Sequence, residues 1–153
     1  MTMIDISDKP EILREATASG TIRLKPATIQ LINKGKIAKG DPLYTCKIAA
    51  ILAAKRTSSL IPLCHPIPIA KVEVKTDIVD ESNVQVTATV RTMAQTGVEM
   101  EALTATAFGL LTIWDMVKQY EKDAKGQYPT TTIEDIHVVK KMKTAACKKE
   151  SQK

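Results

Sequence analysis

The sequence contains few aromatic residues, few cysteines and no long apolar run. Aromatic residues make up 3% of its 153 residues, and the cysteines are Cys46, Cys64 and Cys147. Because the bases of single-stranded nucleic acid stack on aromatic side chains, their scarcity disfavours such a binding surface. Three cysteines are too few for a disulfide framework and favour a reducing compartment. No stretch of 18 apolar residues occurs, so we expect no membrane-spanning helix.

The N-terminal segment also lacks the features of a secretion signal. Its residues, MTMIDISDKPEILREA, are charged and contain no apolar core. Together with the cysteine content, this predicts a cytoplasmic protein. The length is close to the most common domain size, and the apolar fraction of 44% and charged fraction of 25% are ordinary for a globular chain. We therefore predict one domain over residues 1–143 and a basic tail over residues 144–153.

The net charge of +5 is unevenly distributed. All of it lies from Lys140 onward, where six lysines face one glutamate, and residues 1–139 are neutral in total. Inside this neutral body, residues 14–71 carry a net charge of +8 and residues 72–139 carry −6. The C-terminal lysines are typical of a solvated, disordered tail. The basic half is more informative, because it predicts a site for phosphate groups.

Hydrophobic periodicity and turn residues predict seven regular elements. They are a strand over 14–24, a short helix from Pro26 to about Gly35, a helix over 43–57, antiparallel strands over 71–79 and 84–92, a long helix over 98–122 and a final strand over 131–143. Before the strand pair, three prolines within seven residues predict a rigid extended loop. The order β-α-α-β-β-α-β indicates an α+β fold of the ferredoxin-like type, in which helices pack on one face of an antiparallel sheet.

Two of these helices have distinctive faces. In the second helix, Asp41 and Pro42 form a strong start signal, and Ile48, Ile51 and Leu52 share one apolar face. The long helix carries an apolar stripe of Leu103, Ala107, Leu110, Trp114 and Val117. Its content of Ala, Thr and Gly109 predicts that its backbone approaches another element closely.

The loop Leu63-Cys64-His65-Pro66 is the first candidate site. Prolines on both sides of the Leu-Cys-His triplet restrict the backbone and fix the direction of the imidazole. The alternative is a histidine that binds a nearby carbonyl in a tight loop. We predict no metal here, because adjacent Cys64 and His65 side chains point apart and the chain has no second CxxC or HxxH pair.

Acidic residues of the long helix form the second group of candidates. Glu99 and Glu101 lie in its first turn, where carboxylates complement the helix dipole. Residues two apart are turned by about 200°, so one carboxylate pairs or caps while the other faces a pocket. Asp115 and Lys118 are neighbours on the helix surface. They form either a solvated ion pair or a positioned acid/base pair, and their spacing leaves both open.

The cations of the basic half are a third candidate site. They are Arg14, Arg23, Lys34, Lys36, Lys39, Lys47, Lys55 and Arg56. Lys39 comes just before a predicted helix start, where backbone N–H groups favour an anion. The segment does not match GxxxxGK[ST], which excludes a nucleotide-triphosphatase P-loop. We therefore predict a small phosphorylated ligand, and neither nucleic acid nor a membrane as partner.

Several blocks of the chain resemble one family. They are DISDKPEILREA, KGDPLYTCKIAAILAAKRTSSLIPLCHPI, TGVEMEALTA and LTIWDMVK, in that order. From about Ile4 to Lys143 the chain resembles the MoaC family of molybdenum cofactor biosynthesis, the cyclic pyranopterin monophosphate synthases. The ending EKDAKGQYPTTTIEDIHVVKK is more similar to archaeal members.

This resemblance implies a lyase with a ferredoxin-like fold that assembles as a homohexamer, a trimer of dimers. Such enzymes convert 3′,8-cyclo-7,8-dihydroguanosine 5′-triphosphate to cyclic pyranopterin monophosphate with release of pyrophosphate. A radical S-adenosylmethionine enzyme supplies the substrate. No cofactor is demanded by a motif in this chain, although Mg²⁺ is compatible with a triphosphate substrate.

The resemblance also implies roles for individual residues. Leu63, Cys64 and His65 match a substrate-binding triplet, and Met100 and Glu101 match a second substrate-contacting segment. Asp115 matches the acid of the active site, and Lys118 and Lys39 match catalytic lysines. Lys55 and Arg14 belong to motifs that line the pocket.

The implied chemistry requires proton transfer and cations rather than a redox cofactor. A lysine that acts as the base must have its pKa lowered from about 10.4 to roughly 7–8. Burial and the neighbouring Lys39 would lower the pKa of Lys118, and Asp115 would oppose this. We hypothesise that Asp115 orients the groups around it and that a lysine carries the proton.

The spacing of these residues has a geometric consequence. Glu101 and Asp115 are fourteen residues apart, which is about 21 Å along one helix. One compact pocket cannot readily use both from the same copy of the chain. We therefore predict that the site lies at a subunit interface.

The chain departs from the family at its C-terminus. Many members end in a Gly/Ser-rich KSGGKSG-like segment, whereas this chain ends in KKMKTAACKKESQK. Its lysines either replace that segment or have no role. Two other functions stay open on the residues alone: a nucleic-acid-binding module that uses the basic half and tail, and a ferredoxin-like domain that senses nucleotides without turnover.

Overall fold

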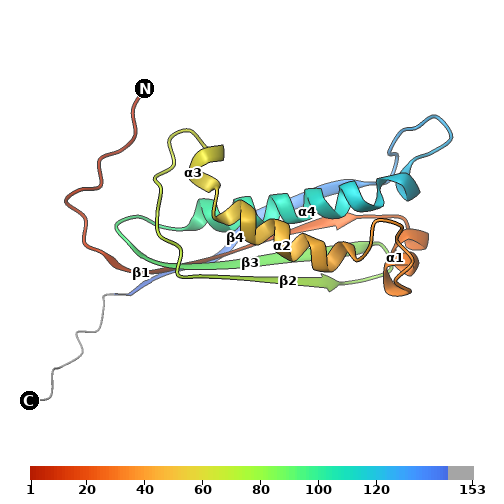
Figure 1. Cartoon of the computed structure of the whole chain (residues 1–153), viewed down its shortest axis with the longest axis horizontal. Coiled ribbons are helices and arrows are strands. Elements are labelled where there is room, and N and C mark those ends of the chain that lie inside the picture. The colour runs from red at the N-terminus through yellow and green to blue at the C-terminus, as the bar shows by residue number, and fades with distance from the viewer. Residues whose placement is uncertain (145–153) are drawn as a thin grey trace, which may run out of the picture.

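The computed structural model describes residues 1–144 and contains one four-stranded antiparallel sheet covered by helices on one face (Figure 1). In chain order the elements are β1 (Ile12–Arg23), α1 (Pro26–Asn33), α2 (Pro42–Ala54), α3 (Thr57–Leu60), β2 (Lys71–Ile78), β3 (Asn83–Ala94), α4 (Glu99–Glu121) and β4 (Thr132–Thr144). The strand order is β2-β3-β1-β4, and each neighbouring pair is antiparallel. The predicted α+β class and ferredoxin-like arrangement are confirmed.

Most element boundaries lie within two residues of the prediction, and the following differences matter most. The second helix was expected to continue to residue 57 but ends at Ala54, and the separate helix α3 follows it. The first strand begins at Ile12, two residues early. Thr144, assigned to the tail, is the last residue of β4, and the remainder of the predicted tail lies outside the described residues.

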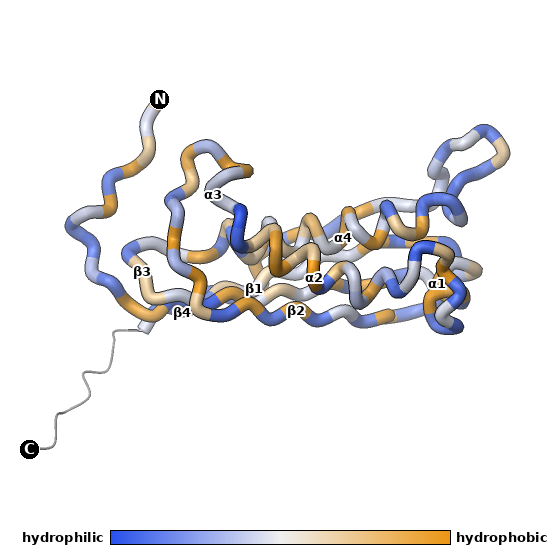
Figure 2. The backbone as a smooth tube through the Cα atoms, in the orientation of Figure 1, coloured by the Kyte–Doolittle hydropathy of each residue, from blue (hydrophilic) through white to orange (hydrophobic). Residues whose placement is uncertain are grey.

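The two faces of the sheet have different chemistry because side chains alternate along each strand. Toward the helices, Ala18 pairs with Ala88 and Ile22 with Val84, and all four are fully buried. On the opposite face, the Thr17 and Thr89 hydroxyls are 2.8 Å apart in a hydrogen bond. The apolar face therefore carries the core, and Figure 2 shows apolar residues along α2, α4 and the strands beneath them.

Helix α4 packs closely on both α2 and the sheet. A Cβ atom added to Gly109 would lie 3.0 Å from Cys46 Sγ and 3.2 Å from Val86 Cγ1. The predicted close approach is thus confirmed. The predicted apolar stripe is correct for Leu110 and Val117, which are fully buried. Its other members, Leu103, Ala107 and Trp114, are only partly buried. Small residues, Ala102, Ala105 and Thr106 among them, occupy much of the contact instead.

The apolar face of α2 points away from the core. Ile48 and Leu52 are about half exposed, and the buried residues of the helix are Pro42, Cys46, Ala50, Ala53 and Ala54. Small side chains face α4 because the two helices lie too close for larger ones. The chain therefore presents an apolar strip on its outer surface.

Helix α4 is long and apolar enough to span a membrane by composition. In the fold it lies on the sheet, and 56% of its most apolar window is buried. This is the burial expected of a helix that packs in the core of the domain.

A buried carboxylate fastens the end of α4. Glu121 is fully buried, and its oxygens accept hydrogen bonds from the Thr28 hydroxyl at 2.5 Å, the Thr131 hydroxyl at 2.5 Å and the Lys25 backbone N–H at 3.1 Å. These donors belong to the start of α1 and the segment before β4. Glu121 thus binds the backbone N–H of Lys25, the residue directly before α1, and the side chain of Thr28 in its first turn.

We predict that Glu121→Ala lowers the free energy of unfolding by about 3 kcal/mol, because three donors lose a charged acceptor. Glu121→Gln should lose less, since one oxygen remains. Urea denaturation followed by circular dichroism measures the change. Glu81→Ala, at an exposed glutamate in the β2–β3 turn, is the control and should change stability little. Equal stability of Glu121→Ala and wild type would contradict the assignment.

Candidate functional site

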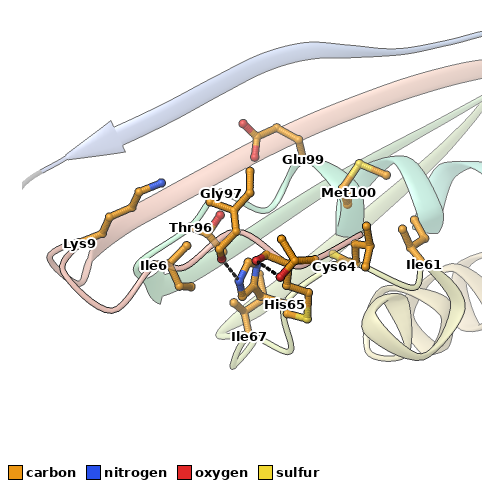
Figure 3. Close-up of a pocket in the computed structure, with 14 residues that line it drawn as sticks. Ile6, Lys9, Ile61, Cys64, His65, Ile67, Thr96, Gly97, Glu99 and Met100 are labelled. Carbon is orange, nitrogen blue, oxygen red and sulfur yellow. Dashed lines mark hydrogen bonds between the residues drawn. The ribbon is translucent and has the colours of Figure 1, made fainter.

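The candidate residues gather in two clusters at opposite ends of α4. The first lies where the N-terminal segment, the proline-rich loop and the start of α4 meet, around a cavity of about 590 Å³ (Figure 3). The second lies near the C-terminal end of α4, where the loop between α1 and α2 reaches the helix. We call them the His65 cluster and the Asp115 cluster.

His65 is held by the N-terminal segment. Residues 61–70 contain no strand or helix, as their prolines predicted, and the loop places Leu63, Cys64 and His65 in the wall of the cavity. The Nε2 atom of His65 lies 2.8 Å from the Ile4 carbonyl oxygen. The alternative of a carbonyl-bound histidine is therefore observed, but the carbonyl comes from a segment 61 residues away. A substrate that binds His65 Nε2 must replace this contact.

Glu101 is the buried acid of this cluster. Its exposed fraction is 2%, and the Cys64 thiol donates to its Oε1 atom at 3.9 Å. Within residues 1–144, its Oε2 atom has no hydrogen-bond partner. Burial raises the pKa of the Glu101 carboxyl, and burial together with the Glu101 charge raises the pKa of the Cys64 thiol. A buried polar oxygen without a hydrogen-bond partner is rare in folded proteins, so this atom is available to a donor that reaches it.

Glu99 faces a different direction from Glu101, as the helix geometry predicted, but the paired Glu99 lines the cavity and the buried Glu101 does not. Its Oε1 atom pairs with Lys141 Nζ of β4 at 2.5 Å. Gly97 makes room for this carboxylate, because a Cβ atom at residue 97 would clash with the Glu99 side chain. Lys141 was counted only among the basic residues near the C-terminus. Its place beside Glu99 depends on the register of β4, which residue order alone does not reveal.

The other predicted residues of this end have varied positions. Met100 lines the cavity and is partly exposed. Arg14 donates to the carbonyls of Ala94 and Gln95, at 2.9 and 3.0 Å, and lines a smaller neighbouring cavity of about 80 Å³. Lys55 caps the end of α2, is exposed, and is not part of the wall of the His65 cavity as the described residues form it.

The Asp115 cluster joins two lysines to one carboxylate. Lys39 Nζ donates to Asp115 Oδ2 at 2.7 Å and to the Asp115 carbonyl at 2.9 Å, and Lys118 Nζ lies 2.8 Å from Oδ1. Hydrogen bonds from Lys118 and then Lys39 lower the pKa of Asp115 to about 2. The three predicted residues therefore come together, although 76 residues separate Lys39 from Asp115.

The expected lowering of the Lys118 pKa is wrong for this chain. Its side chain is 45% exposed, so burial does little to disfavour the charge. The hydrogen bond and the negative charge of Asp115 instead raise the pKa of Lys118. Lys118 is thus a protonated cation at neutral pH. Its pKa is set by the Asp115 carboxylate rather than by the neighbouring charge of Lys39.

An apolar wall adjoins the Asp115 cluster. Leu111, Trp114 and Ile133 line a shallow cavity of about 370 Å³ together with Asp115 and Lys118. The Trp114 ring is fixed by an edge contact with Tyr128, with ring centres 5.4 Å apart. This end of α4 therefore offers charge and a flat apolar surface side by side.

Neither cluster has the donors of a metal centre. Within residues 1–144, no three side chains of His, Cys, Asp or Glu lie close enough to hold an ion. Cys46 and Cys64 are free thiols in that part of the chain, and Cys147 lies outside it.

Comparison with known proteins identifies the family. A model of the MoaC family matches residues 3–144. The chain belongs to the MoaC family. It is 56% identical over 142 residues to a protein of Pyrococcus horikoshii named "Probable cyclic pyranopterin monophosphate synthase", which covers 93% of this chain and 89% of that protein.

Proteins with the same name from two other archaea are similar over nearly their whole length. That of Sulfolobus acidocaldarius is 56% identical over 142 residues, with 93% of this chain and 99% of that protein covered. That of Methanococcoides burtonii is 52% identical over 141 residues, with 92% and 88% covered. The resemblance predicted from the residues, including its archaeal character, is confirmed.

We predict that replacing both lysines raises the pKa of Asp115 toward 3.8, the value of an unpaired aspartate. In wild type the ion pairs persist above that value and are lost as the pH falls through about 2, because the folded chain holds the carboxylate ionised. Carbon-13 NMR of the Asp115 carboxyl in wild type and in Lys39→Met/Lys118→Met measures the difference. Lys36→Met, at an exposed lysine of the same loop, is the control. Identical titration curves for wild type and the double variant would contradict the cluster.

Proposed function

We propose that this chain is a cyclic pyranopterin monophosphate synthase of molybdenum cofactor biosynthesis. It converts 3′,8-cyclo-7,8-dihydroguanosine 5′-triphosphate to cyclic pyranopterin monophosphate and releases pyrophosphate. The observation that carries the proposal is the Lys39–Asp115–Lys118 cluster, assembled from two distant segments in a chain whose relatives bear that name. A radical S-adenosylmethionine enzyme is proposed as the supplier of the substrate.

The Asp115 cluster suits the phosphate end of this reaction. A ribose hydroxyl joins the α-phosphorus as pyrophosphate leaves, so negative charge grows on phosphate oxygens. The ammonium groups of Lys39 and Lys118 each lie within 2.8 Å of a different oxygen of the Asp115 carboxylate. This contact holds them in place before the reaction, ready to stabilise the growing phosphate charge. Since Asp115 keeps Lys118 protonated, Lys118 is proposed to donate a proton rather than to remove one.

The His65 cluster suits the ring end of the substrate. Its cavity is lined by Leu63, Cys64, His65 and Met100, mostly apolar walls with one imidazole. Behind Cys64, the buried Glu101 has an oxygen that needs a donor, which matches the amino and imino groups of a reduced pterin. These five residues are therefore proposed to bind the substrate, with Arg14 and Lys55 in supporting positions.

The distance between the clusters implies that two chains share each site. Glu101 and Asp115 lie on one uninterrupted helix, about 21 Å apart along its axis. We propose that the His65 cluster of one copy meets the Asp115 cluster of another, within a hexamer built as a trimer of dimers. The exposed apolar side chains of α2 and α4 support association, among them Tyr44, Ile48, Leu52, Phe108 and Leu111.

The remaining conditions are part of the same proposal. No resident cofactor is proposed, and Mg²⁺ would enter with the triphosphate of the substrate. The free thiols Cys46 and Cys64 fit a reducing cytoplasm. Neither nucleic acid nor a membrane is proposed as a partner, because aromatic side chains for base stacking are few and Lys39 and Lys118 are both paired with Asp115.

The reaction itself and the role of Lys118 are tested together. Incubation with 3′,8-cyclo-7,8-dihydroguanosine 5′-triphosphate should release pyrophosphate and a pterin, whereas a nucleotide sensor would bind the substrate without turnover.

We predict that Lys118→Arg lowers kcat by about 10²-fold or more, because Arg keeps the charge but cannot give up a proton. Retention of most of the rate in Lys118→Arg would show that charge alone matters. Lys122→Arg, at the exposed residue that directly follows α4, is the control.

Mixed oligomers test the shared site. Glu101→Ala and Lys118→Ala chains should each be inactive. In a random mixture half of the pairs contain one chain of each kind, and such a pair has one intact site of its two. The mixture should therefore recover about a quarter of the wild-type activity. Pyrophosphate release after joint refolding measures the recovery. Circular dichroism of each variant shows that the chains fold. Proven mixed oligomers without activity would exclude a site of this composition.

A further inference from the structure

The loop that carries Lys39 is anchored to the core by the buried Ile37 side chain, and its residues on either side of Ile37 are exposed. Residues 34–41 link α1 to α2 without helix or strand, and Gly35 and Gly40 within this loop have φ angles of +63° and +99°. Lys39 is exposed, so no surrounding side chains enclose it. Its ammonium nevertheless reaches both the carboxylate and the carbonyl of Asp115. The reach of this ammonium group depends on the distance between the loop backbone and α4.

A tyrosine of α4 binds the loop backbone. The Ala38 backbone N–H donates to the Tyr120 hydroxyl oxygen at 2.9 Å. Ala38 directly precedes Lys39, and Tyr120 lies five residues after Asp115 on the same helix. The Tyr120 ring is partly buried and packs on the core, which includes Ile37 of the loop. One helix thus presents one partner to the loop backbone and another to the Lys39 ammonium.

We propose that Tyr120 is a positioning residue, whose hydroxyl sets the loop backbone so that Lys39 reaches Asp115. The consequence for catalysis rests on the proposed role of Lys39, while the effect on the Lys39–Asp115 contact does not. The Ala38–Tyr120 hydrogen bond is exposed, so water can satisfy both groups when it is broken. Its loss should therefore change stability little and change the placement of Lys39 more.

Tyr120→Phe distinguishes the contribution of the Tyr120 hydroxyl from that of its ring. The Phe ring keeps the packing on the core and removes only the acceptor. We expect kcat to fall about fivefold, the factor equivalent to one net hydrogen bond, with a midpoint of unfolding close to wild type. Glu81→Gln, at an exposed glutamate in the β2–β3 turn and outside both clusters, is the control and should leave kcat and the midpoint of unfolding unchanged.

A double-mutant cycle distinguishes positioning from a general structural effect. If Tyr120 acts through Lys39, Tyr120→Phe should lower kcat in the wild-type background and should have no further effect in Lys39→Met. The same fold-loss in both backgrounds, or no loss in either, would overturn the proposal.

The titration of Asp115 gives a readout that does not require turnover. Release of Lys39 in Tyr120→Phe should move the Asp115 carboxyl pKa upward, toward the value measured in Lys39→Met. An Asp115 titration identical to that of wild type would overturn the proposal. Wild-type chain that releases no pyrophosphate would contradict the proposed function, and this NMR measurement would still decide the role of Tyr120.

Discussion

The close packing of α4 on α2 and the sheet is the constraint on which the rest of the structure depends. Gly109 lets the backbone of α4 come within contact distance of Cys46 and Val86, and the small residues around it continue that contact. A helix of 23 residues pressed along a flat surface has little freedom to bend. The two clusters at its ends are therefore held apart at a fixed distance. Within one chain they cannot act on the same atom, which is the geometric basis of the proposed site between two copies.

The environments at the two ends of α4 shift the pKa values of the carboxyl groups in opposite directions. Glu101 is buried beside a neutral thiol, and its pKa is raised. Asp115 is exposed between two ammonium groups, and its pKa is lowered. The carboxyl group of Glu101 at one end is thus easier to protonate, whereas Asp115 at the other end stays ionised at neutral pH and keeps Lys118 charged. A site formed from both would combine an acid and cations, which the loss of pyrophosphate from a triphosphate requires.

Much of the fold follows from local patterns. The signal of Asp41 and Pro42 predicted the start of α2, and Asp41 Oδ1 indeed accepts from the N–H groups of Leu43 and Tyr44. Alternating residues predicted the hairpin of β2 and β3, because a half-buried strand repeats every two residues. The buried face of α2 was missed, since it consists of small side chains that carry little hydropathy and the larger apolar residues lie outside. The short helix α3 was missed because its four residues are too few to show a period.

The sequence by itself determined the family, the order of the elements and the side chains available for chemistry. Long motif blocks and the periods of helices and strands are local properties, and they are legible without a fold. Only the tertiary structure decided the partner of each charged group. It brought Lys39 to Asp115, Lys141 to Glu99 and the Ile4 carbonyl to His65, and it reversed the expected direction of the Lys118 pKa. The physical reason is that desolvation and ion pairing depend on groups that meet from distant segments, at distances set by how closely the helices and strands pack.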